Sequence, residues 1–241
     1  MNLYVLGSSS SGNCYLLYTE NSILIIEAGI PFKELNRLHL FDMRKVVGCI
    51  ITHEHGDHAS RVEEYQSKGI KCYASTGTRE KLNDKVINIG FFESKEFSVF
   101  PFSISHDAAD PVGFLIQTKD ENVLFATDTY LLRYTFRDLT AILIECNYSM
   151  DIINKNLEEG RISNARRERI ILSHMELSTC IDTIKSNDLS KLNKVLLLHL
   201  SDSNSDEELF VRTVEESVNV RTLAANKGLN INLDTPFYKH S

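Results

Sequence analysis

Three histidines and one aspartate fall within the six-residue stretch 53–58, which reads HEHGDH. Imidazole and carboxylate groups are suited to Zn²⁺, and also to Mn²⁺ or Fe²⁺. His53 and His55 are two positions apart in extended chain, so their side chains project to the same side and can share one ion. Asp57 and His58 follow a turn at the intervening glycine and can address a second ion. The spacing predicts a metal-binding loop.

Three more residues of ligand type lie where apolar, strand-like runs end. They are His106, Asp128 and His199, which close the runs 100–105, 123–127 and 195–198. Any one of them is typical of a hydrogen-bonded turn residue. Together they repeat one geometry, and α/β proteins place their sites at the ends of strands. We therefore expect these residues to complete the metal site.

Strand-like and helical segments alternate without a linker or repeat, which predicts a single α/β domain over 1–241. One helical pattern follows the metal loop over 58–68, and another covers 206–218. The spacing of a serine and a glutamate is typical of a capping box and predicts a helix start near Ser173. Strands are expected at 2–6, 14–19, 22–27, 46–52, 71–74, 86–89, 97–104, 113–118, 122–127, 141–146, 194–198 and near 229–233.

The serine-rich segment 7–13, GSSSSGN, joins the first two expected strands. It can be a flexible hairpin loop. Its small hydroxyl groups equally suit one wall of a site. Both interpretations stay open.

Composition restricts the class of protein. The chain has 241 residues, of which 42% are hydrophobic, enough for one substantial core. Its net charge of −7 argues against binding nucleic acid through a broad basic face, but not against a nuclease whose metals supply positive charge. Five scattered cysteines predict free thiols. Because no run has membrane-spanning length and the first residues do not form a secretory signal, we expect a cytoplasmic protein without membrane contact.

These motifs resemble the metallo-β-lactamase superfamily over most of the chain. The resemblance implies a four-layer αβ/βα sandwich with two divalent metal ions, zinc or alternatively manganese. Carried over by position, one ion is held by His53, His55 and His106, the other by Asp57, His58 and His199, and Asp128 bridges the two. We also expect Asp57 to orient a metal-bridged hydroxide.

Two finer likenesses point to phosphodiesterase branches. The stretches 7–15, 106–113 and 199–204 resemble the YycJ-type exonuclease group of bacteria and phages. Glu145 and His174 resemble the glutamate–histidine pair of tRNase Z, in which the histidine contacts the scissile phosphate and aids proton transfer. We therefore expect Asp57, His174 and Glu145 to be catalytic. The alternatives are a locally satisfied strand acid for Glu145 and a helix N-terminal residue for His174.

Glu27 departs from the superfamily pattern, which usually has an aspartate at the end of the second hairpin strand. That acid supports the metal loop by hydrogen bonds. A glutamate keeps the charge and reaches one methylene further, so the support is expected to be differently spaced.

The first functional hypothesis is a binuclear metal-dependent nuclease acting on DNA or RNA in a bacterial or phage-infected cell, with a homodimer as one expected assembly. A cyclic-nucleotide phosphodiesterase is the alternative within the class. A lactam or thioester hydrolase, a flavodiiron-like redox protein and a non-catalytic metal domain are weaker. His55 does not fit the redox branch, which typically has a glutamate at this position. The pair Glu145 and His174 does not fit the lactamase branch. A non-catalytic domain is expected to have lost ligands, whereas all seven are present.

Overall fold

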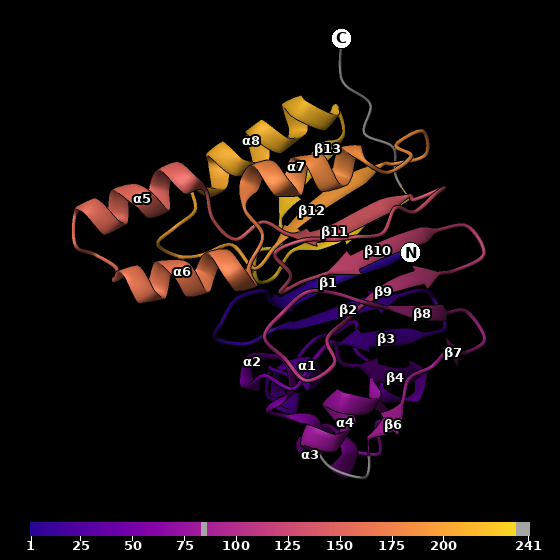
Figure 1. Ribbon diagram of the computed structural model, residues 1–241. Helices are drawn as coiled ribbons and strands as arrows, with labels where there is room; N and C mark the ends of the chain where they lie inside the picture. Colours follow the sequence, from indigo (N-terminus) through magenta and orange to yellow (C-terminus); the bar gives the residue numbers. More distant parts are fainter. Residues whose placement is uncertain (83–85, 235–241) are drawn as a thin grey trace. The chain divides into compact units, whose positions relative to one another are not determined.

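The computed structural model describes residues 1–82 and 86–234 (Figure 1). The described chain divides into two compact units. The first unit comprises residues 1–103, 108–121 and 225–234. The second comprises residues 104–107 and 122–224. Each unit joins segments that are far apart in sequence, and the single domain expected over 1–241 stays a prediction. No helix in the described part of the chain has the length and apolarity needed to cross a bilayer.

A sheet with the strand order β14-β1-β2-β3-β4-β5-β6 is the scaffold of the first unit. Neighbours from β1 to β3 are antiparallel, and those from β3 to β6 are parallel. All four residues of β3 are buried, as expected for an apolar strand covered on both faces. The strands are β1 (Asn2–Gly7), β2 (Cys14–Tyr18), β3 (Ile23–Ile26), β4 (Val46–Ile50), β5 (Cys72–Ala74), β6 (Ile87–Asn88) and β14 (Asn230–Asn232).

The first unit also contains short helices and an antiparallel strand set. The helices are α1 (Phe32–Asn36), the 3₁₀ helix η1 (Met43–Lys45), α2 (Gly56–Ala59), α3 (Val62–Ser67) and α4 (Thr76–Leu82), and the strands are β7 (Phe92–Glu93), β8 (Ser98–Ser103) and β9 (Val112–Gln117). The single helix expected over 58–68 is therefore two helices. The break arises because the Arg61 amide donates to the Ala28 carbonyl and the Ala28 amide donates to the His58 carbonyl, which removes groups that would continue the helix.

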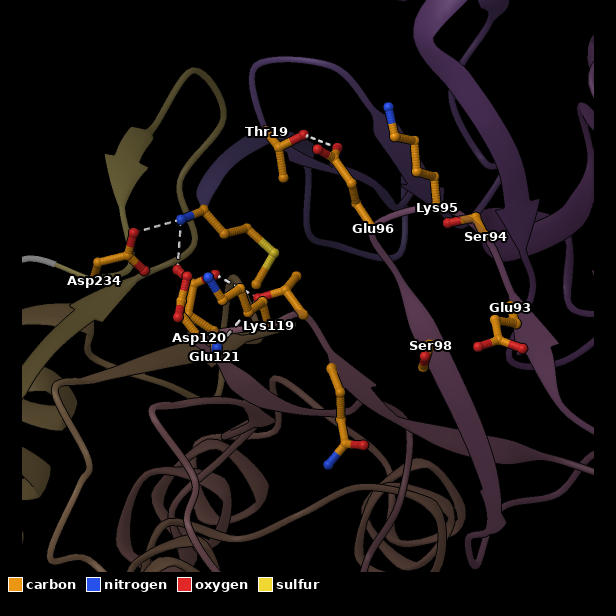
Figure 2. A pocket seen from close by; sticks show the side chains of 13 residues that line it. Thr19, Glu93, Ser94, Lys95, Glu96, Ser98, Lys119, Asp120, Glu121 and Asp234 are labelled. Atoms are coloured by element: carbon orange, nitrogen blue, oxygen red, sulfur yellow. Dashed lines mark hydrogen bonds and ion pairs between the residues drawn. The ribbon is translucent and has the colours of Figure 1, made fainter.

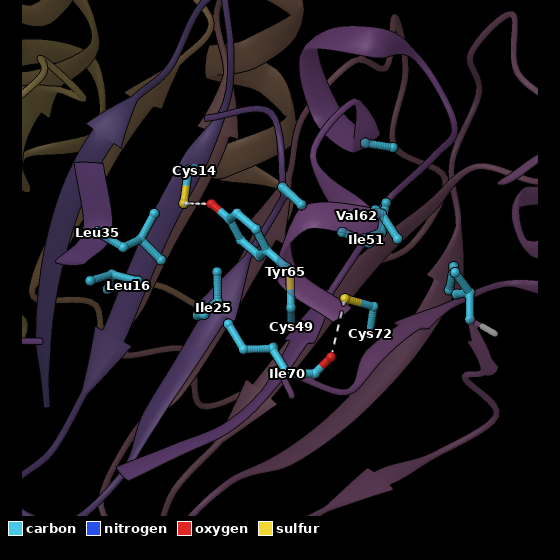
Figure 3. Packing of buried hydrophobic residues seen from close by; sticks show 14 of the residues in the cluster. Cys14, Leu16, Ile25, Leu35, Cys49, Ile51, Val62, Tyr65, Ile70 and Cys72 are labelled. Carbon is cyan, nitrogen blue, oxygen red and sulfur yellow. Dashed lines mark hydrogen bonds between the residues drawn. The ribbon is translucent and has the colours of Figure 1, made fainter. Parts of the chain in front are cut away.

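Tyr65 on α3 packs into the hydrophobic core of the first unit (Figure 3). It is fully buried among strand residues such as Leu16 and Ile25. All five cysteines are buried free thiols, and the free thiols were predicted. One of them, Cys14, has its Sγ 3.6 Å from the Tyr65 hydroxyl, which donates to the Ile30 carbonyl at 2.8 Å. These contacts fix helix α3, which follows the loop 53–58, against the core of the first unit.

The second unit is built on the parallel strands β10 (Asn122–Ala126), β11 (Ala141–Glu145), β12 (Lys194–Leu198) and β13 (Arg221–Ala224). Its helices are α5 (Met150–Glu158), α6 (Asn164–Ser173), α7 (Leu177–Lys185) and α8 (Glu207–Val218). Helix α7 packs on β11 and α8 packs on β13, with the two helices side by side (Figure 1). Parallel strands align their carboxyl ends at one edge of the sheet, where ligand-type residues are expected to gather.

The helix expected to start near Ser173 starts instead at Leu177, and Ser173 is the last residue of α6. The capping-box prediction was wrong because the Ser173 hydroxyl donates back to the Arg169 carbonyl within α6. Glu176 caps α7 with its own side chain. His174 therefore lies in the extended turn between two helices, and it is not a helix N-terminal residue.

Candidate metal centre

The metal loop, residues 53–58, brings its four predicted ligands together within the first unit. His53 Nε2 lies 3.1 Å from His55 Nδ1, and His58 Nε2 lies 3.3 Å from Asp57 Oδ2. The ring centroids of His53 and His58 are 4.1 Å apart. Two of the histidines are buried, while His55 and Asp57 are half-buried. The loop therefore presents nitrogen and oxygen ligands from inside the fold toward a partly open surface.

Backbone hydrogen bonds hold this loop against two segments, one that precedes β2 and one that follows β3. The Ala28 amide donates to the His58 carbonyl at 2.7 Å, and the Asn13 amide donates to the Asp57 carbonyl at 2.7 Å. Gly29 is required here because a Cβ would collide with the Asp57 carbonyl. Gly56, by contrast, starts helix α2 with open space around it. The turn therefore comes from the helix start and does not depend on a glycine.

Glu27 supports the metal loop from behind. It is completely buried and accepts hydrogen bonds from the Thr52 hydroxyl at 2.5 Å and the Thr52 amide at 3.3 Å. Its carboxylate also lies 3.4 Å from His58 Nδ1. Burial raises the pKa of Glu27, and the charge and hydrogen bonds of His58 and Thr52 offset only part of this effect. These contacts with Thr52 and His58 are the kind expected of an acid that supports the metal loop, here from a glutamate.

Asn13 is a site residue that the sequence did not single out. Its side chain is fully buried, and Nδ2 lies 3.1 Å from His58 Nε2 and 3.4 Å from Asp57 Oδ2. Of the two interpretations of the segment 7–13, this contact favours the wall of a site at its last residue, and that interpretation stays a prediction. The one sequence feature that could have indicated Asn13 is its place at the end of the turn of glycines and serines, residues 7–13.

Four residues of the second unit converge at the carboxyl ends of its parallel strands. Asp128 follows β10, Glu145 ends β11, His199 follows β12, and His174 comes from the turn after α6. One ligand atom of each lies within 4.8 Å of those of the others. We call these four residues the strand-end cluster. The expectation that strand-end residues meet is confirmed for Asp128 and His199.

Left-handed backbone gives the residues that end strands their direction. Asp128 has φ 50°, His199 has φ 53° and Glu27 in the first unit has φ 68°. Residues other than glycine rarely adopt this backbone conformation, and surrounding contacts must offset its cost in free energy. For His199 the contact is Asn147, whose Nδ2 donates to the His199 carbonyl at 2.7 Å. Asn147 is a second positioning residue that the sequence did not reveal.

Glu145 and His174 form the closest pair in the strand-end cluster, with Oε1 2.7 Å from Nδ1. The other oxygen, Oε2, accepts from the amides of Thr129 at 2.8 Å and Met175 at 3.2 Å. Because these donors occupy its oxygens, Glu145 is suited to positioning and less suited to binding metal. Burial opposes its ionisation, but His174 and His199 outweigh burial and hold the pKa of Glu145 below its ordinary value. Burial likewise opposes the charge on His174, but Glu145 raises the pKa of His174.

His106 belongs to the second unit and is oriented by α6. Its Nδ1 lies 3.0 Å from the Ser173 carbonyl, which leaves Nε2 facing Asp107 at 3.3 Å. Burial lowers the pKa of His106 despite the carboxylates nearby. The imidazole is therefore biased toward the neutral form, which is the form that binds metals.

The donor set fits divalent metal ions. In three predicted ligands an oxygen atom lies at Nδ1, and these oxygens belong to Thr52 for His53, Glu27 for His58 and Ser173 for His106. An oxygen at Nδ1 is the usual way in which proteins orient an imidazole that binds a metal ion through Nε2. In His58, Nε2 also lies 3.1 Å from Asn13 Nδ2.

A separate cavity of about 710 Å³ in the first unit is lined by none of the predicted site residues (Figure 2). Ion pairs join the Met1 amino group to Glu121 at 2.5 Å and to Asp234 at 2.6 Å. The cavity lining does not include the metal loop.

Known proteins resemble this chain in sequence. The model of the metallo-β-lactamase superfamily matches residues 9–76, which include Asn13 and the metal loop. Exodeoxyribonuclease WalJ of Streptococcus pneumoniae is 25% identical over 261 residues, covering 98% of this chain and 93% of that protein. Exodeoxyribonuclease YycJ of Bacillus anthracis is 23% identical over 257 residues, covering 98% of this chain and 96% of that protein.

Solved structures resemble the chain in fold. The Zn²⁺-bound PqqB of Methylobacterium extorquens has a TM-score of 0.75 at 13% identity, with 96% of this chain and 100% of that chain covered. The short form of human tRNase Z has a TM-score of 0.59 at 13% identity, with 97% and 99% covered.

Proposed function

For a chain with the metallo-β-lactamase fold and relatives of the YycJ exonuclease type, we propose metal-dependent hydrolysis of phosphodiester bonds at the ends of DNA. The predicted fold and the predicted resemblance to the superfamily and to this group are confirmed by the comparisons. The names of the two relatives favour a polymeric substrate over a cyclic nucleotide, a lactam or a thioester.

We assign two divalent ions to the seven predicted ligands. Zinc suits the mixture of imidazole and carboxylate, and manganese is the alternative. Bound ions of this kind supply a nucleophilic water near neutral pH and polarise a phosphoryl oxygen. One ion is assigned to His53, His55 and His106, the other to Asp57, His58 and His199, with Asp128 as the bridge.

The Glu145–His174 pair carries the proposal for a phosphodiester. A phosphodiester needs a proton for the alkoxide that leaves, and His174 Nδ1 is held by Glu145 at 2.7 Å, which leaves Nε2 to donate. Glu145 acts through His174 and is therefore a positioning residue. Asp57, on the metal loop, is assigned to orient the attacking water. A homodimer and a cytoplasmic location stay predictions.

The test compares the metal-loaded protein on four substrates: a simple phosphodiester, linear duplex DNA, a structured RNA and a cyclic mononucleotide. Metal content is measured in the same preparations. We expect turnover on DNA ends that Asp57→Ala removes. Turnover that persists in Asp57→Ala, or a protein that never binds stoichiometric metal, would contradict the proposal.

A further inference from the structure

The segment 129–137, TYLLRYTFR, combines exposed aromatic residues with arginines and lies directly after Asp128. Tyr130 is 38% exposed and Tyr134 is 45% exposed, and both Arg133 and Arg137 are exposed. The segment contains two positive charges and no acidic residue, although the chain as a whole carries −7. Exposed aromatic side chains next to a site can contribute to ligand binding.

Both ends of the segment are fixed to the second unit. At its start, the Thr129 amide donates to Glu145 at 2.8 Å, and the Thr129 hydroxyl accepts from the Ser105 amide at 3.1 Å. Near its end, the Phe136 amide donates to Asn187 at 2.7 Å. The backbone between these points has neither helix nor strand. The exposed side chains are therefore carried on an anchored stretch of chain.

The anchors also give the segment a direction. Thr129 lies at the carboxyl end of β10, beside the strand-end cluster, whereas the Arg137 carbonyl accepts from Asn122 at the opposite end of the same strand. The segment thus runs back along the length of β10, about 16 Å for five residues. Tyr130 and Tyr134 lie in sequence along a path that leads away from Asp128.

We propose that the segment 129–137 is a stacking surface for the unpaired nucleotides of a single-stranded DNA end, an inference that rests on the proposed phosphodiesterase function. Aromatic rings stack on any base whose face is open, and arginines attract the adjoining phosphates. Inside a duplex, each base is stacked on its neighbours and offers no such face. Because the acidic chain cannot hold DNA by a broad basic face, stacking beside the site supplies affinity that charge does not.

The test measures binding to a short fluorescent oligothymidylate with phosphorothioate linkages by anisotropy, using the metal-loaded protein. An abasic oligomer of the same length serves as the probe that keeps the backbone and lacks the bases. The unmodified protein should prefer the oligothymidylate. Tyr130→Leu and Tyr134→Leu should each weaken its binding roughly tenfold and reduce that preference. Tyr130→Phe and Tyr134→Phe should bind like the unmodified protein, since they keep the ring. Arg133→Gln should weaken the binding of both probes to the same extent.

Phe91→Leu and Phe100→Leu are matched controls, because these rings are also exposed, at 51% and 41%, but lie in the first unit. They should bind oligothymidylate like the unmodified protein. The proposal is overturned if Tyr130→Leu and Tyr134→Leu bind normally, if the abasic probe binds equally well, or if a blunt duplex competes as effectively. Hydrolysis of the simple phosphodiester by the unmodified protein reports separately on the proposed function: turnover with unchanged binding in the tyrosine variants rejects only the stacking surface.

Discussion

The metal loop of the first unit and the strand-end cluster of the second unit each bring several imidazole and carboxylate groups together, but in different ways. In the loop, His53, His55, Asp57 and His58 come from six consecutive residues. In the cluster, Asp128, Glu145, His174 and His199 come from positions separated by up to 71 residues (199 − 128). The loop depends on local chain direction, and the cluster depends on strand topology.

Each group nevertheless places one fully buried glutamate behind its imidazoles. Glu27 contacts Thr52 and His58, and its pKa is raised because burial dominates. Glu145 contacts His174 and His199, which outweigh burial and lower its pKa. The first glutamate is thus mainly a hydrogen-bond support, and the second is the charged partner of a histidine. We expect the former to govern metal binding and the latter to govern proton transfer.

The largest expected effect follows from removing the histidine of the second pair. His174→Ala should lower kcat on DNA ends by roughly 10²–10⁴-fold, the usual contribution of a positioned acid, while metal content is unchanged. Steady-state kinetics with metal analysis checks this. His39→Ala, at an exposed histidine, is the control and should behave like the unmodified protein. Loss of metal in His174→Ala would mean that His174 is a ligand.

The two glutamates should respond differently to the same change. Glu27→Gln should weaken metal affinity roughly 10–100-fold, because Thr52 then meets an amide that accepts at only one atom. Glu145→Gln should mainly lower kcat, since the amide no longer favours a charged His174. Glu27→Asp, which restores the usual residue type of the superfamily, should lie between Glu27→Gln and the unmodified protein. Competition with a chelating dye measures the affinities, and identical profiles for the two Gln variants would contradict the division of roles.

A smaller effect is expected at Asn147, which holds His199 in its left-handed conformation. Asn147→Ala removes the donor to the buried His199 carbonyl and should lower the free energy of unfolding by about 1–3 kcal/mol. Asn21→Ala, at an exposed asparagine, should change it by less than about 0.5 kcal/mol. Urea denaturation of the metal-free protein compares them. Equal stabilities would show that His199 keeps its conformation without Asn147.

The last prediction needs no substitution, because buried cysteines in the two units can report on the unfolding of each unit. Burial raises the pKa of Cys14 to about 12, and burial also raises the pKa of Cys146. At pH 8, well below these values, the folded thiols are protonated and should not react with a thiol reagent. Unfolding returns the pKa toward about 8.5 and exposes them. If 1–241 is a single domain, mass spectrometry should find both cysteines labelled at the same urea midpoint, whereas separate midpoints would indicate two domains.

The sequence predicted what depends on local spacing. The six-residue metal loop is contiguous, so alternation along extended chain was enough to group His53 with His55. His106, Asp128 and His199 were recognisable because each closes an apolar run, and the structure brings Asp128 and His199 together. The assignment of all seven residues to two ions stays a prediction.

Features that depend on distant hydrogen bonds escaped the sequence. Asn13 and Asn147 are ordinary asparagines until folding places them beside His58 and His199. The left-handed backbone at Glu27 has no sequence signal of the kind that glycine provides. The helix start predicted at Ser173 failed for a related reason. The Ser173 and Glu176 spacing fits a capping box, but the Ser173 hydroxyl donates to the Arg169 carbonyl within the preceding helix.

The central claim is that the seven predicted ligands hold two ions that the reaction requires. Its most direct test is to strip the protein of metal, add Zn²⁺ or Mn²⁺ in known equivalents, and follow hydrolysis of end-labelled linear DNA. The account predicts no turnover without metal and a plateau at two equivalents per chain. Full turnover in the stripped protein, or a plateau at one equivalent, would contradict it.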